Sequence, residues 1–255
     1  MLNVPRLATM VAAFQGIYYC AHFASFVFAP KYRTLSVAEQ NLWCQFTCSF
    51  IKGTVLCCLI YPMVWANFAA FRSVTSLDGA VNGTGMEFPL YWFTGYAISD
   101  TVSLVRFYAK GDKAMVIHHV ATMLTWCYLL HLDFGHDLAA IACLVEFTTP
   151  LLALRWFMAT LGAKDHPLYV VNGLVILLSW WALRVGVYVV WFGVKSFSII
   201  ANGRLRLPRD APIVAAWLVG SALQLLWAKK LTVGFAKVVR EMTGGTKKSV
   251  EAKDE

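Results

Sequence analysis

Two adjacent histidines, His118 and His119, stand in an apolar stretch that is long enough to cross a membrane. The preceding apolar stretch carries Asp100. A carboxylate that orients an imidazole raises its basicity, and this is the general arrangement of a catalytic base. Ionisable side chains inside membrane spans are costly and usually face a bundle interior or a cavity. We therefore predict that these three residues are catalytic.

Helical geometry indicates how these three side chains could meet. At ~1.5 Å of rise per residue, Asp100 lies about 12 Å from the cytoplasmic end of its span. The two histidines lie about 6–8 Å from the same end of the next span. A short loop joins the two spans, so they should be antiparallel neighbours. We therefore expect Asp100 to reach one histidine, and the two rings to point about 100° apart.

Five more polar side chains within the spans are predicted to bind a lipid or its headgroup. They are Arg155, Asn172, Glu146, Arg184 and Lys52. Arg155 and Asn172 fall at the depth of the histidines. Glu146 and Arg184 lie about 20–25 Å from the cytoplasmic side, which suggests a second layer and an ion pair. Lys52, near mid-depth, needs Asp100 or Glu146 as a partner to keep its charge.

Other interpretations of these residues stay open. A histidine in a helix is often a packing residue whose ring is hydrogen-bonded. Glu146 and Arg184 could form a purely structural strut. Arg155 and Arg184 could instead extend to the membrane surface or bind a lipid phosphate. A proton relay in a transporter would also use buried charges, although the sequence contains no inverted repeat.

The spans that carry these residues follow from composition. The chain has 255 residues, is 59% hydrophobic and is only 14% charged. Its mean hydropathy is +0.60. The apolar residues gather in stretches of the length needed to cross a bilayer, about 20 residues. We predict an all-α polytopic membrane bundle of about seven helices, at 7–29, 42–66, 88–108, 114–132, 137–161, 168–193 and 211–235.

Three regions are expected along the chain. Residues 1–39 form an N-terminal helix, which we interpret as an uncleaved anchor, and its loop. Residues 40–235 form the main transmembrane domain, and 236–255 form a charged, disordered cytoplasmic tail. The bias of Lys and Arg among the loops favours an N-terminus outside and a C-terminus inside. Six spans with a re-entrant first segment are the alternative.

Several classes of function are disfavoured. The net charge of +8 reflects a basic tail beside the membrane, without the basic stripe that nucleic-acid binding requires. The polar segment 131–137 between two spans serves as a connector, so no metal site is predicted. Pro150 is expected to kink its span just after Glu146. The sequence contains no nucleophile elbow, P-loop or dinucleotide fingerprint.

The ordered set of motifs resembles the TLC-domain family over residues 40–235. It consists of Asp100, the histidine pair, Glu146-Phe-Thr-Thr-Pro150, Leu154-Arg155-Trp156, Asn172-Gly173 and Arg184. The segment from Glu146 to Trp156 is most similar to the TLC-domain-containing branch of this family. The ceramide synthases are more distant, because the carboxylates that follow their paired histidines are absent here, apart from Glu146.

The resemblance implies a six-helix core, preceded here by one N-terminal helix, around a lipid-accessible cavity. It implies a role in membrane lipid homeostasis, with acyl transfer at His118 and His119 if the protein is an enzyme. No resident cofactor is expected; acyl-CoA or a phospholipid would be the acyl donor. A non-catalytic lipid sensor, lipid-binding protein or trafficking protein is the alternative. The expected partners are membrane lipids and a second copy of the chain, in the endoplasmic reticulum or else the plasma membrane.

Overall fold

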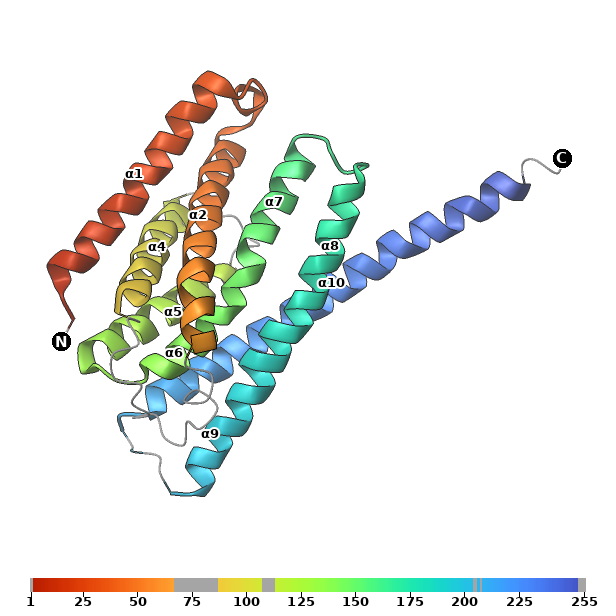
Figure 1. Cartoon of the computed structure of the whole chain (residues 1–255). Helices are drawn as coiled ribbons and strands as arrows, with labels where there is room; N and C mark the ends of the chain where they lie inside the picture. Colours follow the sequence, from red (N-terminus) through yellow and green to blue (C-terminus); the bar gives the residue numbers. More distant parts are fainter. Residues whose placement is uncertain (1, 67–86, 107–112, 204–205, 207, 252–255) are drawn as a thin grey trace.

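The protein is a bundle of membrane-spanning helices, as the sequence predicts (Figure 1). The computed structural model describes residues 2–66, 87–106, 113–203, 206 and 208–251. Every regular element within those ranges is helical. Most of each connection expected between the second and third spans and between the third and fourth spans lies outside the described residues.

Each predicted span corresponds to one helix or to one run of consecutive helices. The first span is α1 (Val4–Phe28), followed by the short turn η1 (Tyr32–Thr34). The next three are α2 (Val37–Ala66), α4 (Glu87–Arg106) and α5 (Lys113–Leu132). The fifth combines α6 (His136–Cys143), η2 (Leu144–Phe147) and α7 (Thr148–Thr160). The sixth combines α8 (Pro167–Ser179), the π-helix η3 (Trp180–Trp191) and α9 (Phe192–Ala201), and the seventh is α10 (Ala211–Glu251).

Six of these segments are long and apolar enough to cross a membrane, and α4 is not among the six. The reason is its position within the bundle. More than half of its residues are buried, among them Thr94, Ser99 and Asp100. A helix surrounded by other helices can carry polar groups that find partners in the protein, so its mean hydropathy is lower.

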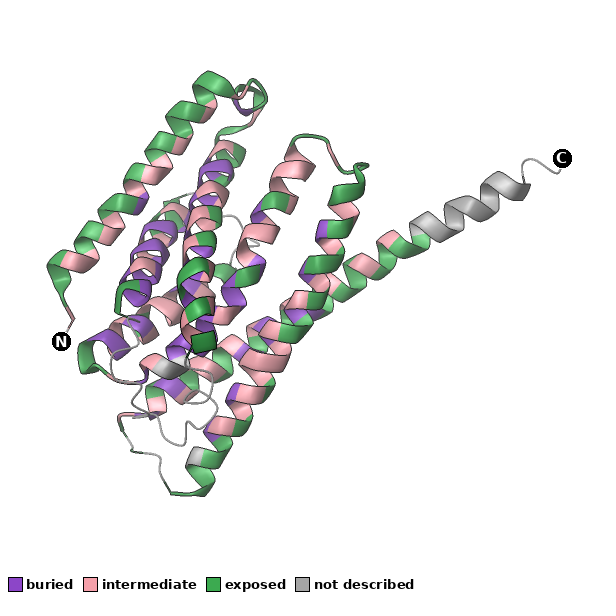
Figure 2. Ribbon diagram, in the orientation of Figure 1, coloured by how far each residue is buried: buried purple, intermediate pink, exposed green. Residues whose placement is uncertain are grey.

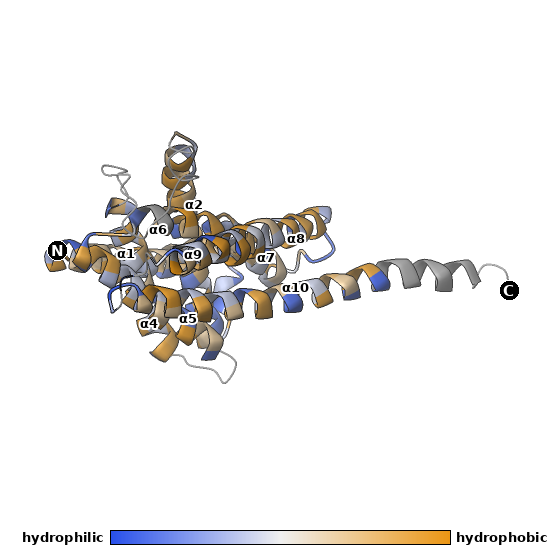
Figure 3. Cartoon of the chain, turned by 90° about the horizontal axis from the view of Figure 1, so that it is seen from below, coloured by the Kyte–Doolittle hydropathy of each residue, from blue (hydrophilic) through white to orange (hydrophobic). Residues whose placement is uncertain are grey.

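The outer surface of the bundle is apolar. Figure 2 shows that buried residues gather on α2 and α4, whereas most of α1 is exposed. Large hydrophobic side chains remain exposed along the spans, for example Phe28 (81%), Trp65 (84%) and Phe197 (71%). Figure 3 shows apolar residues along the helices of the bundle. This distribution is that of a protein whose solvent is lipid.

The last helix extends well past the rest of the bundle (Figure 1). It continues to Glu251, so residues 236–251 are helical where the sequence predicts a disordered tail. A helix already formed within the bundle can be extended at little cost, because each further residue adds one hydrogen bond without a new nucleation step.

A close contact between α2 and α7 positions part of the candidate site. A Cβ atom at Gly53 would lie 2.8 Å from Cδ of Pro150 and 3.1 Å from Cβ of Thr149. Only a residue without a side chain allows the two helices to approach so closely. The neighbours of these residues in sequence are Lys52 on α2 and Glu146 just before α7.

We predict that Gly53→Ala lowers the free energy of unfolding by about 1–3 kcal/mol, because the new methyl group displaces α7 from α2. The matched control is Gly16→Ala, since a Cβ atom at Gly16 meets no atom within 4 Å. That control should be neutral or slightly stabilising, because alanine favours helix more than glycine does. Thermal unfolding of both variants in the same detergent tests this, and equal midpoints would contradict the prediction.

Candidate functional site

A cavity of about 380 Å³ lies within the bundle, and ionisable side chains are among the residues of its wall. Its wall contains residues of α2, α4, α5, η2, α7, η3 and α10. Six ionisable side chains of the predicted site line it: Lys52, Asp100, His118, His119, Glu146 and Arg184. Groups that the sequence assigned to two layers therefore surround one cavity.

His119 and Asp100 form the closest contact between the predicted catalytic residues. Nδ1 of His119 lies 3.3 Å from Oδ2 of Asp100, and both side chains are more than nine-tenths buried. The predicted proximity of Asp100 and a histidine is confirmed. Nδ1 makes no hydrogen bond with the described part of the chain, so the ring is not aligned with the carboxylate. Catalytic hydrogen bonds often tighten only when substrate is bound.

His118 points to a different neighbour, as the spacing along a helix predicts. Its ring centroid lies 5.4 Å from the ring of Trp227 on α10, in an edge-to-face arrangement. The two histidine rings are 5.6 Å apart. Both line the larger cavity, and His118 also lines a smaller one beside it. One imidazole therefore contacts a carboxylate while the other remains close enough to share a ligand.

The buried partner of Glu146 is Lys52, which corrects the expected pair of Glu146 with Arg184. Nζ of Lys52 donates to Oε2 of Glu146. The same oxygen accepts a hydrogen bond of 2.8 Å from Oγ1 of Thr149. The Lys52 ammonium also lies 4.4 Å from the ring centroid of Phe93, within the range of a cation–π contact. The close approach of α2 and α7 brings the two charges together.

Arg184 is held by neutral groups. Its Nε donates to Oγ1 of Thr148 at 2.7 Å, and Nη1 donates to Oε1 of Gln224 at 3.2 Å. Its guanidinium carbon lies 4.3 Å from the ring centroid of Trp180. Arg184 is only 6% exposed. A buried cation whose direct partners are neutral favours an anion in the adjoining space.

Arg155 and Asn172, which the sequence predicts to bind a lipid at the depth of the histidines, do not line the larger cavity. Nη1 of Arg155 donates to the backbone oxygen of Tyr169 at 2.8 Å, and its guanidinium stacks on the Tyr169 ring. Nδ2 of Asn172 donates to the backbone oxygen of Leu151 at 3.0 Å. Both residues join α7 to α8. The sequence gives their depth but not the side of the helix that faces the cavity.

The structure adds cavity residues that the sequence did not single out. Those with polar side chains include Gln45, Tyr96, Thr122, Trp126 and Gln224. The sequence contains a signal for two of them, because Thr122 and Trp126 follow His118 at intervals of four residues. Positions four apart lie on one face of a helix. The others depend on neighbouring helices and leave no local signal.

The described residues contain no group of three or more His, Cys, Asp and Glu side chains that could hold a metal ion. At the start of α6, Nε2 of His136 lies 3.7 Å from Oδ1 of the exposed Asp133 in the preceding connector. This contact has the character of a weak surface pair.

Comparison with known proteins agrees with this architecture. The model of the TLC domain matches residues 40–233, which is most of the chain. The chain belongs to the TLC-domain family. TLC domain-containing protein 4-B of Xenopus laevis is 25% identical over 95% of this chain and 93% of its own length. TLC domain-containing protein 4 of Xenopus tropicalis is 28% identical over 86% of this chain and 84% of its own length.

The human TLC domain-containing protein 4 is 21% identical, over 87% of this chain and 84% of its own length. No solved structure matches this TLC-domain protein at a significant level. The resemblance that the motifs indicated is thus confirmed at the level of the family. The catalytic and lipid-binding roles of the individual residues remain predictions.

We predict that Lys52→Met and Glu146→Gln each lower the free energy of unfolding by about 3–5 kcal/mol, because either change breaks a buried ion pair. The double variant should be more stable than either single variant, because it removes both charges together. Thermal unfolding of the three variants in nanodiscs measures the difference. Additive losses in the double variant would show that the two side chains do not depend on each other.

Proposed function

We propose that this TLC-domain protein binds an acyl lipid in the larger cavity and transfers its acyl group, as part of membrane lipid homeostasis. The observation that carries the proposal is the contact of His119 with Asp100 at a cavity wall that His118 shares. Membrane lipids surround the bundle, so their local concentration near the larger cavity is high. The exposed Lys230 on α10 adds a positive charge to the lining.

The lining is suited to a ligand with a polar end. Nε2 of Gln45 is buried and has no hydrogen-bond partner among the described residues, and it belongs to a cavity residue. Buried donors are nearly always satisfied, so a ligand or water is expected beside it. Arg184, whose direct partners are neutral, would stabilise a phosphate or a carboxylate in the same space.

In the proposed reaction an uncharged imidazole accepts the proton of an acceptor lipid's hydroxyl or amine. The oxygen or nitrogen thus freed attacks the acyl carbonyl carbon of the donor, which is acyl-CoA or a phospholipid. The bond from that carbon to the donor's sulfur or oxygen then breaks, and the leaving atom takes the proton from the imidazolium. Asp100 would hold His119 in position and stabilise its charged form while it carries the proton.

A second function, lipid binding without catalysis, is favoured by one observation. Nδ1 of His119 is close to Asp100 but makes no hydrogen bond with it or with any other described residue. A base that is not aligned with its carboxylate is not prepared for proton transfer. The same cavity would then serve lipid sensing or trafficking. For either function we propose the endoplasmic reticulum as the compartment, with the plasma membrane as the alternative.

We predict that His119→Ala and Asp100→Asn each reduce acyl transfer by about 10²- to 10⁴-fold, the usual contribution of a general base. The purified full-length protein would be given a labelled acyl-CoA or a labelled phospholipid together with a lipid mixture. Mass spectrometry of the products gives the rate and the acceptor.

The matched control is His131→Ala, since His131 lies on the same helix but is exposed and lines neither cavity. Its transfer rate should equal that of the wild type. A wild-type protein that retains bound lipid but transfers no acyl group would reject catalysis and favour the lipid-binding function.

A further inference from the structure

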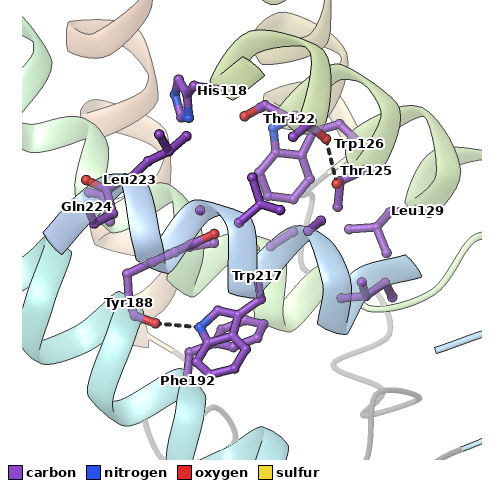
Figure 4. A pocket seen from close by; sticks show the side chains of 18 of the residues that line it. His118, Thr122, Thr125, Trp126, Leu129, Tyr188, Phe192, Trp217, Leu223 and Gln224 are labelled. Carbon is purple, nitrogen blue, oxygen red and sulfur yellow. Dashed lines mark hydrogen bonds between the residues drawn. The ribbon is translucent and has the colours of Figure 1, made fainter. Parts of the chain in front are cut away.

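A smaller cavity of about 80 Å³ adjoins the larger one (Figure 4). The two share Phe93, His118, Thr122 and Glu146 in their walls. From this junction the smaller cavity continues between α5, η3, α9 and α10. Much of the remaining wall is apolar, with Leu129, Phe192, Ile213, Trp217 and Leu223 among its residues. A ligand whose polar end lies beside the histidines could therefore extend the first few carbons of an apolar chain into this space.

Some hydrogen-bond donors in the wall of the smaller cavity have an acceptor within the protein, and one does not. Oγ1 of Thr125 donates to the backbone oxygen of Ala121 at 2.7 Å, and Nε1 of Trp217 donates to the backbone oxygen of Tyr188 at 3.0 Å. Nε1 of Trp126 is buried and has no partner among the residues that the structure describes. Trp126 is only 8% exposed, so bulk solvent does not satisfy it.

An unpaired indole N–H at this position calls for an acceptor. The indole nitrogen is a donor only, and burying it without an acceptor carries a desolvation cost. In Figure 4 the nitrogen of Trp126 is directed toward the end of the cavity where His118 and Thr122 lie. That end is the junction of the two cavities. We therefore expect a ligand that spans the two cavities to supply the acceptor for Nε1 of Trp126.

We propose that Nε1 of Trp126 donates a hydrogen bond to the carbonyl oxygen of an acyl lipid, and that the first few carbons of its acyl chain, next to the carbonyl, occupy the smaller cavity. The inference rests on the proposed function, in which the larger cavity binds the polar part of the same lipid. It assigns the carbonyl to the junction, next to His118. Trp126 is thereby a binding residue that recognises the acyl linkage itself, as distinct from the headgroup or the chain.

This assignment separates an acyl lipid from its ether counterpart. An alkyl ether has the same chain and headgroup but lacks the carbonyl oxygen, so it leaves the indole donor unpaired. The probes are a 1-acyl lysophosphatidylcholine and the 1-alkyl ether lipid of the same chain length. Their dissociation constants would be measured with the full-length protein in nanodiscs, for the wild type and for Trp126→Phe.

We expect the wild type to bind the acyl probe about threefold to tenfold more tightly than the ether probe, the usual value of one neutral hydrogen bond. Trp126→Phe should lose this preference by weakening only the binding of the acyl probe. Its unfolding midpoint should be equal to or above that of the wild type, because phenylalanine retains an aromatic ring and removes an unpaired buried donor.

Two other tryptophans provide matched controls. Trp217→Phe removes an indole N–H from the same cavity, but one that is already bonded to Tyr188, so it should lower stability and keep the acyl preference. Trp92→Phe removes another unpaired indole N–H, from a residue that lines neither cavity, and should also keep the preference.

The outcomes distinguish the inference from the function on which it rests. If the wild type binds neither probe, the proposed lipid binding fails and the role of Trp126 fails with it. If the wild type binds both probes and Trp126→Phe keeps the acyl preference, lipid binding stands and the role of Trp126 is rejected. An equal loss for both probes in Trp126→Phe would also reject it, because the ring alone would then account for the effect.

Discussion

The packing of the bundle depends on a buried lysine and glutamate that neutralise each other. Lys52 on α2 and Glu146 on η2 are both almost fully buried. Neither charge could remain there alone, because removing one partner leaves an uncompensated charge in a medium of low dielectric constant. Gly53 and Pro150 allow the helices to come close enough for the pair to form. The pair therefore requires α2 and α7 to pack together.

The other charges of the cavity are accommodated differently. Arg184 is satisfied by a hydroxyl, an amide oxygen and an aromatic ring, so its positive charge is not cancelled by a direct partner. Asp100 faces His119 without a hydrogen bond from its Nδ1. The larger cavity thus combines one neutralised pair with two buried nitrogens, Nδ1 of His119 and Nε2 of Gln45, that have no hydrogen-bond partner among the described residues. A purely structural polar network would more typically be fully satisfied.

The walls of the two cavities differ in the number of ionisable side chains they contain, and this difference fits a ligand with two ends. Ionisable groups surround the larger one, whereas aromatic and aliphatic side chains predominate around the smaller one. His118 belongs to both walls. The π-helix η3 contributes to each, since Arg184 lines the larger cavity and Tyr188, four residues later, lines the smaller. Segments of π-helix often occur at functional sites.

The sequence by itself determined the class of the protein, the helical segments of the bundle and the resemblance to the family, because apolar length and motif order are properties of the chain alone. It also predicted that Asp100 would reach a histidine, since a short loop forces neighbouring antiparallel helices. Only the tertiary structure decided that Glu146 pairs with Lys52 and that Arg155 and Asn172 join α7 to α8. It also decided that the indole N–H of Trp126 has no acceptor among the residues it describes. Rise per residue gives the depth of a side chain, but the rotation of each helix against its neighbours decides which partner it meets.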